Sequence, residues 1–250
     1  MQRSHPTRKA ARPPISTPLI AQFPSTNFVI GGGVAIFHIA SARVVLCYHT
    51  RDHYYFLPKG RRDVNETTAQ GAEREGYEES GYRNRVVPIV ISHRQPQPRV
   101  LKDPRIHNLS VEPVWTMLMP QSPHSQYLLF WYVAETLPPD VETQMDQELA
   151  DAEASGESMN FFGDAPSYRY PPRFELDMTL KERLAKEPSG YEPPRHEGTS
   201  ADEEEMLYSS ELVSVDTAIE RLGEGVMADV VRKGWEGIVA RMDLEGIGHA

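Results

Sequence analysis

The chain has 250 residues, with 36 acidic side chains (Asp+Glu) against 26 basic ones (Lys+Arg) and a formal net charge of −10 at pH 7. This length suits one well-buried core with insertions and excludes two full domains of usual size. Cys47 is the only cysteine, which excludes a disulfide framework and a zinc cluster, and the sequence has no run of 18 apolar residues that would span a membrane.

The first 26 residues are basic and rich in proline. Arg3, Arg8, Lys9 and Arg12 lie there, and no acidic residue precedes Asp52. Such a start is typical of a mitochondrial presequence, but four prolines up to Pro18 would break an amphipathic helix. We therefore expect residues 1–26 to be a disordered tail on a cytoplasmic protein. A nuclear location stays open, and a mitochondrial one is less favoured.

Two runs of β-branched and aromatic residues, 28–37 and 43–48, are separated by a short turn and predict a pair of strands. The first run contains Gly31-Gly32-Gly33, which lacks the Lys-Ser/Thr ending and the following helix of a phosphate loop. A bulge or a close approach of two backbones is the favoured interpretation. Cys47 closes the apolar part of the second run and is expected to be a buried, inert thiol.

Further elements follow in chain order. Residues 54–57 predict a short strand, and Thr67 with Gln70 forms a capping box for a helix that ends near Gly81. Residues 85–92 predict a strand that Pro88 places at an edge or bulge. Residues 127–134 predict an aromatic strand, in which Trp131 and Tyr132 are expected in the core; stacking on a base, with Trp115, is the alternative.

The segment 138–205 differs from the rest in composition. It holds 18 acidic residues, 6 basic residues and eight prolines, which leaves a net charge of +2 for the remaining chain. Such a composition predicts a disordered insertion rather than part of the core. After it, residues 211–215 predict a last strand, 217–222 and 227–239 predict helices, and 241–250 are expected to form a tail.

The window 60–82 carries the strongest functional pattern. It reads Gly60-x5-Glu66-x7-Arg74-Glu75-x2-Glu78-Glu79-x-Gly81-Tyr82. On a helix, Glu75, Glu78 and Glu79 would share an arc of about 100° and repel one another. A hard divalent cation that takes oxygen ligands would explain their proximity. An acidic helix face alone is usually just solvated, but a plain surface helix gives no reason for the upstream glycine, glutamate and arginine at these offsets.

This window resembles the signature of the Nudix hydrolases, metal-dependent enzymes that cleave a diphosphate joined to a nucleoside or another group. The resemblance covers residues 27–137 and 206–240. It implies an α/β fold, a Nudix-type α/β/α sandwich with a mixed β-sheet, in a domain 27–240 that encloses the insertion. It further implies that Glu75 and Glu79 ligate Mg²⁺ or Mn²⁺, with Glu78 close by and the Gly60 carbonyl as an extra ligand.

The resemblance also implies catalytic roles. Glu75 or Glu79 would help to deprotonate the attacking water, while Arg74, grouped with them at the catalytic site, would brace the loop and helix together with Glu66. A further base would come from outside the window, and three carboxylates stay unranked: Glu112, Glu135 and Glu142.

Two positions depart from the family pattern. Gly76 stands where an aliphatic residue is usual, and Gly71 stands where the family prefers alanine. Each glycine inside a helix costs about 1 kcal/mol relative to alanine. We therefore expect this helix to be less firmly seated than usual. A non-catalytic binding module, for which Gly76 is the hint, is the alternative to an enzyme.

The approach to the window indicates the substrate class. Leu57-Pro58-Lys59-Gly60 resembles the motif entry of dinucleoside polyphosphate and diphosphoinositol polyphosphate hydrolases. Lys59, Arg61 and Arg62 would pair with several phosphate oxygens, although a solvated basic turn is an equal alternative. A second basic stretch could cover the site or be a polar loop: Arg94, Arg99, Lys102 and Arg105.

The expected partner is a phosphorylated small molecule, with no membrane, and the oligomeric state stays open. Hydrolysis of an RNA 5′ end or cap is a further alternative. Nucleic acid is a less favoured partner, because the basic tail is too short and featureless to argue for RNA contact.

Overall fold

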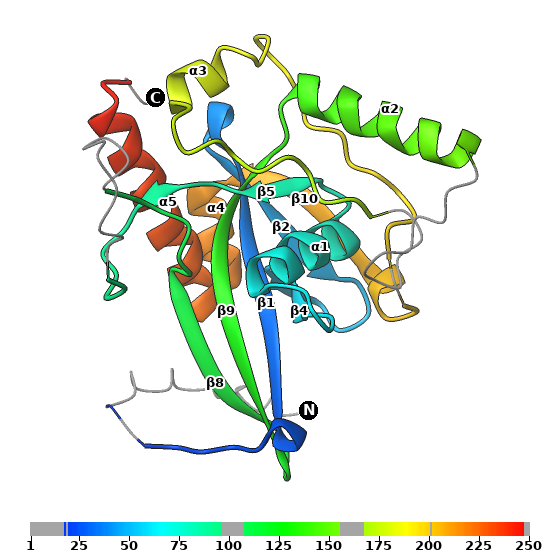
Figure 1. Cartoon of the computed structure of the whole chain (residues 1–250), viewed down its shortest axis with the longest axis vertical. Coiled ribbons are helices and arrows are strands. Elements are labelled where there is room, and N and C mark those ends of the chain that lie inside the picture. Colours follow the sequence, from blue (N-terminus) through cyan, green and yellow to red (C-terminus); the bar gives the residue numbers. More distant parts are fainter. Residues whose placement is uncertain (1–17, 19, 97–107, 156–167, 201, 248–250) are drawn as a thin grey trace, which may run out of the picture.

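The computed structural model describes residues 18, 20–96, 108–155, 168–200 and 202–247. These residues form an eight-stranded mixed sheet (Figure 1) with the order β10-β2-β1-β9-β5, in which β3 pairs with β2, β4 with β1 and β8 with β9. The central strands β1 (Phe28–His38) and β9 (Ser125–Thr136) run parallel, and the other pairs in this sheet are antiparallel. A separate ribbon pairs β6 (Ile89–Val90) with β7 (Leu109–Ser110).

The remaining strands of the large sheet are β2 (Arg43–His49), β3 (Tyr54–Phe56), β4 (Lys59–Arg61), β5 (Asn84–Val86), β8 (Trp115–Ser122) and β10 (Tyr208–Ser214). The helices are α1 (Thr68–Ser80), α2 (Pro139–Ser155), α3 (Leu180–Leu184), α4 (Val215–Leu222) and α5 (Val226–Leu244). No helix among the described residues combines the length and apolar character that crossing a bilayer requires.

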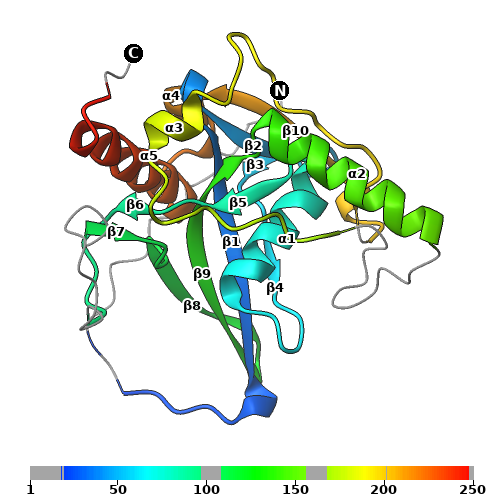
Figure 2. The same ribbon diagram turned by 45° about the horizontal axis from the view of Figure 1, so that its top comes forward.

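Alternate residues of β1 face opposite layers, as the period of a strand requires. Val34 and Ile36 pack with Ala72 of α1, whereas Ala35 and Phe37 belong to the main core with α4 and α5. Figures 1 and 2 show α1 on one side of the sheet and the pair α4–α5 on the other. The α/β/α sandwich expected from the sequence is therefore present.

The three glycines of β1 are places of close approach, as predicted, and the strand runs through them without forming a loop. A Cβ on Gly32 would lie 2.4 Å from the carbonyl oxygen of Thr68, and one on Gly33 would lie 2.6 Å from the Trp131 ring. Trp131 and Tyr132 are buried in the core, and Cys47 is fully buried. These three side-chain predictions are confirmed.

The signals that bound helix α1 were accurate because they are local. The Thr67–Gln70 capping box is present in both directions, and Gly81 ends α1 in the left-handed conformation at φ 76°. Two predicted boundaries were wrong. Pro88, which has no N–H to donate, divides the expected strand 85–92 into β5 and β6, and Val215 opens α4 instead of ending a strand.

The expectation of a disordered insertion at 138–205 is wrong for the residues described. Residues 139–155 form α2, and 168–200 run along the body of the protein (Figure 2). Phe174 and Leu180 enter the main core, and Arg183 is fully buried. Several of its carboxylates pair with the body: Glu142 with Arg83, Glu187 with His38 and Glu192 with Arg43. Residues 156–167 lie outside the described part.

Tails were predicted at both ends of the chain, over residues 1–26 and 241–250. Residues 1–17 and 19 lie outside the described part of the chain. The expected tail at 241–250 is wrong at its start, because α5 continues to Leu244 and two of the residues in its last turns, Arg241 and Met242, are buried. Arg241 donates to the carbonyl oxygens of Pro88 and Met178, which ties α5 to two other segments.

Candidate active site

The window 60–82 folds as strand β4, a connecting loop and helix α1. A Cβ on Gly60 would lie 2.0 Å from Glu75 Oε2, so any other residue here would displace the Glu75 carboxylate. The Glu75 carboxylate thus lies directly against the backbone of β4. Gly71 also meets a close neighbour, since its Cβ would lie 3.0 Å from Glu66 Oε2. At both glycines the loop and the helix lie closer together than is usual beside a Cβ.

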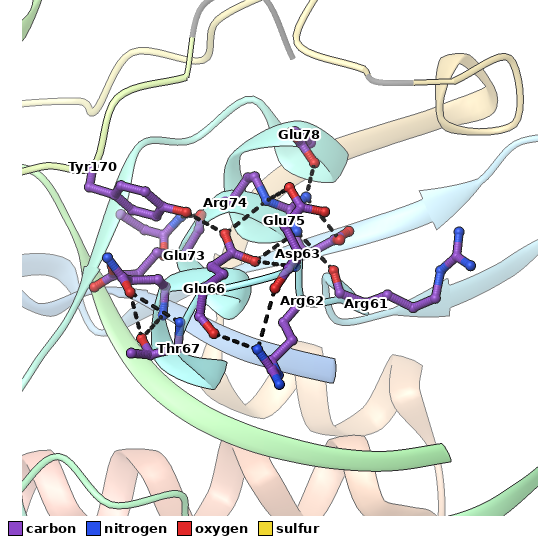
Figure 3. A network of polar contacts seen from close by, with 12 residues as sticks. Arg61, Arg62, Asp63, Glu66, Thr67, Glu73, Arg74, Glu75, Glu78 and Tyr170 are labelled. Atoms are coloured by element: carbon purple, nitrogen blue, oxygen red, sulfur yellow. Dashed lines mark hydrogen bonds and ion pairs between the residues drawn. The ribbon is translucent and has the colours of Figure 1, made fainter. Parts of the chain in front are cut away.

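Arg74 is the centre of a buried network (Figure 3). Its Nε donates to Glu66 Oε1 at 3.0 Å, and its Nη1 donates to Glu78 Oε2 at 2.7 Å and to Glu75 Oε1 at 3.0 Å. Its Nη2 donates to the carbonyl oxygen of Arg61 at 2.8 Å. All its described contacts therefore hold the loop and carboxylates in place, and the structure gives Arg74 a bracing position.

Glu79 lies on the inner side of the site. Its Oε2 accepts a hydrogen bond from the Lys59 backbone N–H at 2.8 Å. Ligand oxygens of Glu75, Glu79 and Glu205 all lie within 4.8 Å of one another. Glu78, which was expected close to the metal, is engaged by Arg74 and is not part of this group.

Glu205 was missed by sequence reasoning. It comes from the acidic run that precedes β10, and the antiparallel pairing of β10 with β2 brings that run beside the site. Asp202 Oδ1 accepts the backbone N–H groups of Glu204 and Glu205 at 2.9 and 3.0 Å. Glu204 is in turn bound by His49 Nε2 at 2.9 Å and by Arg51 Nη2 at 2.7 Å. The run of glutamates was visible in the sequence, but its position beside β2 was not.

Burial sets the electrostatics of the site. It raises the pKa of Glu75 to about 8 and that of Glu78 to about 7, and it raises the pKa of Glu79 well above its ordinary value. Repulsion between Glu75 and its acidic neighbours adds to this effect, and Arg74 opposes it. Closely spaced carboxylate oxygens are the donors that hard divalent cations take. The donor set therefore fits Mg²⁺ or Mn²⁺.

A cleft of about 1390 Å³ opens beside these carboxylates. Its lining includes the acidic residues Asp63, Glu75, Glu78, Asp202 and Glu205 and the cations Arg61, Arg62 and Arg74. The rest of the lining is mainly apolar: Ala21, Phe23, Phe28, Val29, Ile30, Val64, Leu118 and Leu128. Since Glu75 and Glu205 belong both to the cleft and to the group of ligand oxygens, an ion bound there would stand at the edge of the cleft.

The three predicted substrate cations take different positions. Arg61 is exposed and lines the cleft. Arg62 also lines it, but its Nη1 donates to the carbonyl oxygens of Asp63 and Glu66. Lys59 is not among the lining residues of this cleft, and its positive charge instead acts on Glu79. Of the second basic stretch, Arg94 is exposed, whereas Arg99, Lys102 and Arg105 lie outside the described residues.

The three unranked candidates for an additional base do not line this cleft. Glu135 is fully buried between Arg85 and Arg183, each at 2.8 Å. Glu142 pairs with Arg83 at 2.7 Å. Glu112 lies just before the start of β8, and its backbone N–H donates to Ser110 Oγ. Among the described carboxylates outside the window, Glu205 is the one that joins Glu75 and Glu79 in the ligand group.

Gly76 leaves no gap between α1 and the sheet. A Cβ at Gly76 would lie 2.6 Å from Asn84 Nδ2 and 2.9 Å from Val34 Cγ1. Asn84 thus fills the space that an aliphatic side chain would take, and its Nδ2 donates to the Glu73 carbonyl oxygen at 2.9 Å. The missing side chain at Gly76 is therefore compensated by Asn84, and Gly76 no longer argues for a non-catalytic module.

Comparison with known proteins places this site in a family. The model of the NUDIX domain matches residues 30–169. No curated protein matches the chain significantly.

Solved structures with similarity include a NUDIX-family hydrolase from Clostridium perfringens, at 15% identity over 86% of this chain and 95% of that one, with a TM-score of 0.37. A C. elegans Ap4A hydrolase is 13% identical over 85% of this chain and 98% of that one, with a TM-score of 0.39. A MutT NUDIX hydrolase from Burkholderia pseudomallei is 13% identical over 85% and 98%, with a TM-score of 0.34.

Structural similarities this low carry no argument of their own, so the family model and the geometry carry the assignment. The family match spans more than half of the chain and contains the whole window 60–82. The buried arginine hub and the carboxylates grouped around Glu75 agree with it. The chain belongs to the NUDIX domain family and is a Nudix-type pyrophosphohydrolase.

Proposed function

We propose that this protein hydrolyses a diphosphate linkage in a nucleoside polyphosphate, with dinucleoside polyphosphates as the leading substrates. The observation that supports the proposal is the composition of the cleft, in which a group of carboxylates, the arginines Arg61 and Arg62 and an apolar wall line one space. A nucleoside polyphosphate has the matching three parts: a diphosphate that needs a cation, further anionic phosphates and a flat base.

The apolar wall is continuous with the sheet. Ile30 of β1 pairs with Leu128 of β9, and Leu128 pairs with Leu118 of β8, so the three side chains form one row across neighbouring strands. Phe23 stacks on Phe28 beside it, with ring centroids 5.6 Å apart. A row of aliphatic side chains ending in an aromatic pair suits the face of a base. A diphosphoinositol polyphosphate, with phosphates around its ring, offers no comparable apolar face.

The arginines adjoin this wall. Arg61 pairs with Gly31 across β4 and β1, and the Arg62 backbone N–H donates to the Ile30 carbonyl oxygen at 3.1 Å. Both residues therefore lie close to the apolar row at the strand edge. Arginine forms charge-assisted, often bidentate bonds with phosphate oxygens. Phosphates beyond the cleaved linkage would be held here.

Glu75, Glu79 and Glu205 would hold Mg²⁺ or Mn²⁺, which supplies charge neutralisation on the phosphoryl oxygens and a lower pKa for bound water. Arg74 and Glu66 keep Glu75 in position, and the Lys59 backbone N–H keeps Glu79 turned inward. One of the three carboxylates would accept the proton of the attacking water.

A comparison of substrate classes tests the proposal. Catalytic efficiency with Mg²⁺ would be measured on a dinucleoside polyphosphate, a diphosphoinositol polyphosphate, a nucleotide sugar and capped RNA. We expect the dinucleoside polyphosphate to be the best substrate, and a Leu118→Asp variant to lose efficiency on it more than on the diphosphoinositol. A preference for the diphosphoinositol, unchanged by Leu118→Asp, would reject the nucleoside assignment, and no turnover of any substrate would favour a binding module.

A further inference from the structure

The hydroxyl of Tyr127 donates a hydrogen bond to the carbonyl oxygen of Gly60 at 2.9 Å. Tyr127 belongs to β9, whereas Gly60 belongs to β4, and β1 lies between these two strands in the sheet (Figure 1). The phenol therefore crosses a whole strand to reach its acceptor. Tyr127 is not among the residues that line the cleft, and its ring packs against the main core.

Gly31 makes this crossing feasible. A Cβ on Gly31 would lie 2.2 Å from the Tyr127 hydroxyl oxygen, 2.7 Å from its Cε2 and 2.3 Å from the Gly60 carbonyl oxygen. Distances below 3.0 Å leave no room for a side chain, and two of these three atoms belong to the phenol itself. The first glycine of the Gly31-Gly32-Gly33 run thus provides the passage through which Tyr127 contacts β4.

The acceptor of this bond, the Gly60 carbonyl, belongs to a residue in direct contact with the Glu75 carboxylate. Gly60 is the residue whose missing side chain leaves room for the Glu75 carboxylate, with 2.0 Å between its ideal Cβ and Glu75 Oε2. Gly60 pairs with Gly32 of β1 in the antiparallel ladder, where its carbonyl oxygen accepts the Gly32 N–H, so the bond from Tyr127 occupies the second lone pair of that oxygen and restrains it further. Fixing this peptide group fixes both the direction of its carbonyl and the surface on which Glu75 rests.

We propose that Tyr127 is a positioning residue for the divalent-metal site, acting by orienting the Gly60 peptide group and, through it, the Glu75 carboxylate. The inference rests on the proposed function, because it takes Glu75 and Glu79 as the carboxylates that hold the ion. Partners behind metal ligands fix the orientation of those ligands and tune affinity. The role assigned to Tyr127 is of this kind, and it does not include contact with substrate.

The test compares Tyr127→Phe with Tyr132→Phe, a matched control on the same strand. Tyr132→Phe also removes one hydrogen bond, the one between the Tyr132 hydroxyl and Thr68 Oγ1 at 2.6 Å. This bond lies at the start of α1, away from the carboxylates. Binding of Mn²⁺ alone is measured by calorimetry for both variants and the unchanged protein. Circular dichroism establishes the temperature range in which each is folded, and kinetics at varied Mg²⁺ give the activation constant.

We expect Tyr127→Phe to weaken Mn²⁺ binding and raise the Mg²⁺ activation constant about three- to ten-fold, which corresponds to the loss of one hydrogen bond. At saturating Mg²⁺, kcat and the substrate KM should stay within about two-fold, and Tyr132→Phe should leave metal binding unchanged.

Equal Mn²⁺ affinity in Tyr127→Phe and the unchanged protein would overturn the inference and leave the proposed function intact. A raised substrate KM with unchanged metal affinity would also overturn it, by placing the hydroxyl at the substrate. If the unchanged protein bound no Mn²⁺, the proposed function would fail and the inference with it.

Discussion

The hydroxyl of Tyr170 donates a hydrogen bond to the carboxylate of Glu66, 104 residues earlier in the chain (Figure 3). Glu66 also receives bonds from Arg74 and from the backbone N–H of Asp63. At the far end of α1, Thr199 Oγ1 donates to the Glu78 carbonyl oxygen at 3.0 Å, and the His196 N–H donates to that of Gly81 at 2.8 Å. The segment 168–200 thus holds α1 at both ends.

Replacing Arg183 with alanine should destabilise the protein by about 3–5 kcal/mol, because the change leaves the buried Glu135 carboxylate without one of its two charged partners. Arg183 is fully buried, and its Nε donates to Glu135 Oε2 at 2.8 Å. Urea denaturation measures the effect. Arg169→Ala in the same segment is the control, since its pair with Glu148 is partly exposed and should contribute less than about 1 kcal/mol. Equal small losses would show that the segment does not stabilise the body.

Replacing Glu205 with glutamine should lower turnover by about 10- to 100-fold while the fold is retained, because the variant keeps the shape of the side chain and removes a charge from the ligand group. Steady-state kinetics with Mg²⁺ measure the change. Glu203→Gln removes the same charge at an exposed position two residues away and should have little effect. If both variants kept full activity, Glu205 would lie outside the catalytic group.

Metal binding should become more stabilising as pH rises. Burial raises the pKa of Glu75 from 4.5 to about 8 and that of Glu79 well above its ordinary value, so the folded, metal-free protein retains protons on these two carboxylates that the unfolded chain has released. The contribution of Glu75 to stability is complete below about pH 4.5 and is lost as pH rises through about 8. A bound cation needs the ionised carboxylates and reverses the trend.

Melting temperatures with and without Mg²⁺ at pH 5.5 and pH 8.5 test this linkage. The rise in melting temperature caused by Mg²⁺ should be clearly larger at pH 8.5. The same rise at both values would mean that protons and the metal do not compete for these carboxylates.

Selectivity for long phosphate chains should depend more on Arg61 than on Lys59, because Arg61 is exposed in the cleft whereas the charge of Lys59 acts on Glu79. Arg61→Ala should reduce catalytic efficiency on a dinucleoside polyphosphate about ten-fold more than on a nucleotide sugar, since one charge-assisted contact contributes about 1.5–3 kcal/mol. The difference should shrink as salt rises.

Lys59→Ala serves as the comparison and should affect both substrates alike. The reverse ranking, with Lys59 alone discriminating by chain length, would restore the role that the sequence suggested for Lys59.

The parts of the molecule that sequence reasoning predicted correctly depend on local interactions. The capping box at Thr67, the left-handed Gly81 and the buried strands follow from residues a few positions apart. The proximity of the Glu75 and Glu79 carboxylates likewise follows from one short window. Their spacing on a single helix determined their proximity, so no knowledge of the tertiary fold was needed.

The parts that it missed depend on contacts across the chain. Glu205 reaches the site because β10 pairs with β2, and nothing in the acidic run itself indicates that pairing. The compensation of Gly76 by Asn84 was hidden for the same reason. The segment 168–200 has the composition of a disordered chain, yet buried partners such as Glu135 for Arg183 hold it in place.

Turnover by Glu79→Gln is the decisive measurement for the metal-ligand assignment. The glutamine keeps an acceptor for the Lys59 N–H but removes a charge from the ligand group, so kcat with Mg²⁺ should fall about 100-fold or more. Glu73→Gln is the matched control on the same helix, because Glu73 is also a carboxylate with a raised pKa, about 7, but accepts the Val86 N–H away from the ligand group. We expect a large loss of kcat for Glu79→Gln and near-normal kcat for Glu73→Gln. A Glu79→Gln variant that hydrolyses its best substrate at the rate of the unchanged protein would contradict the assignment of Glu79 as a metal ligand.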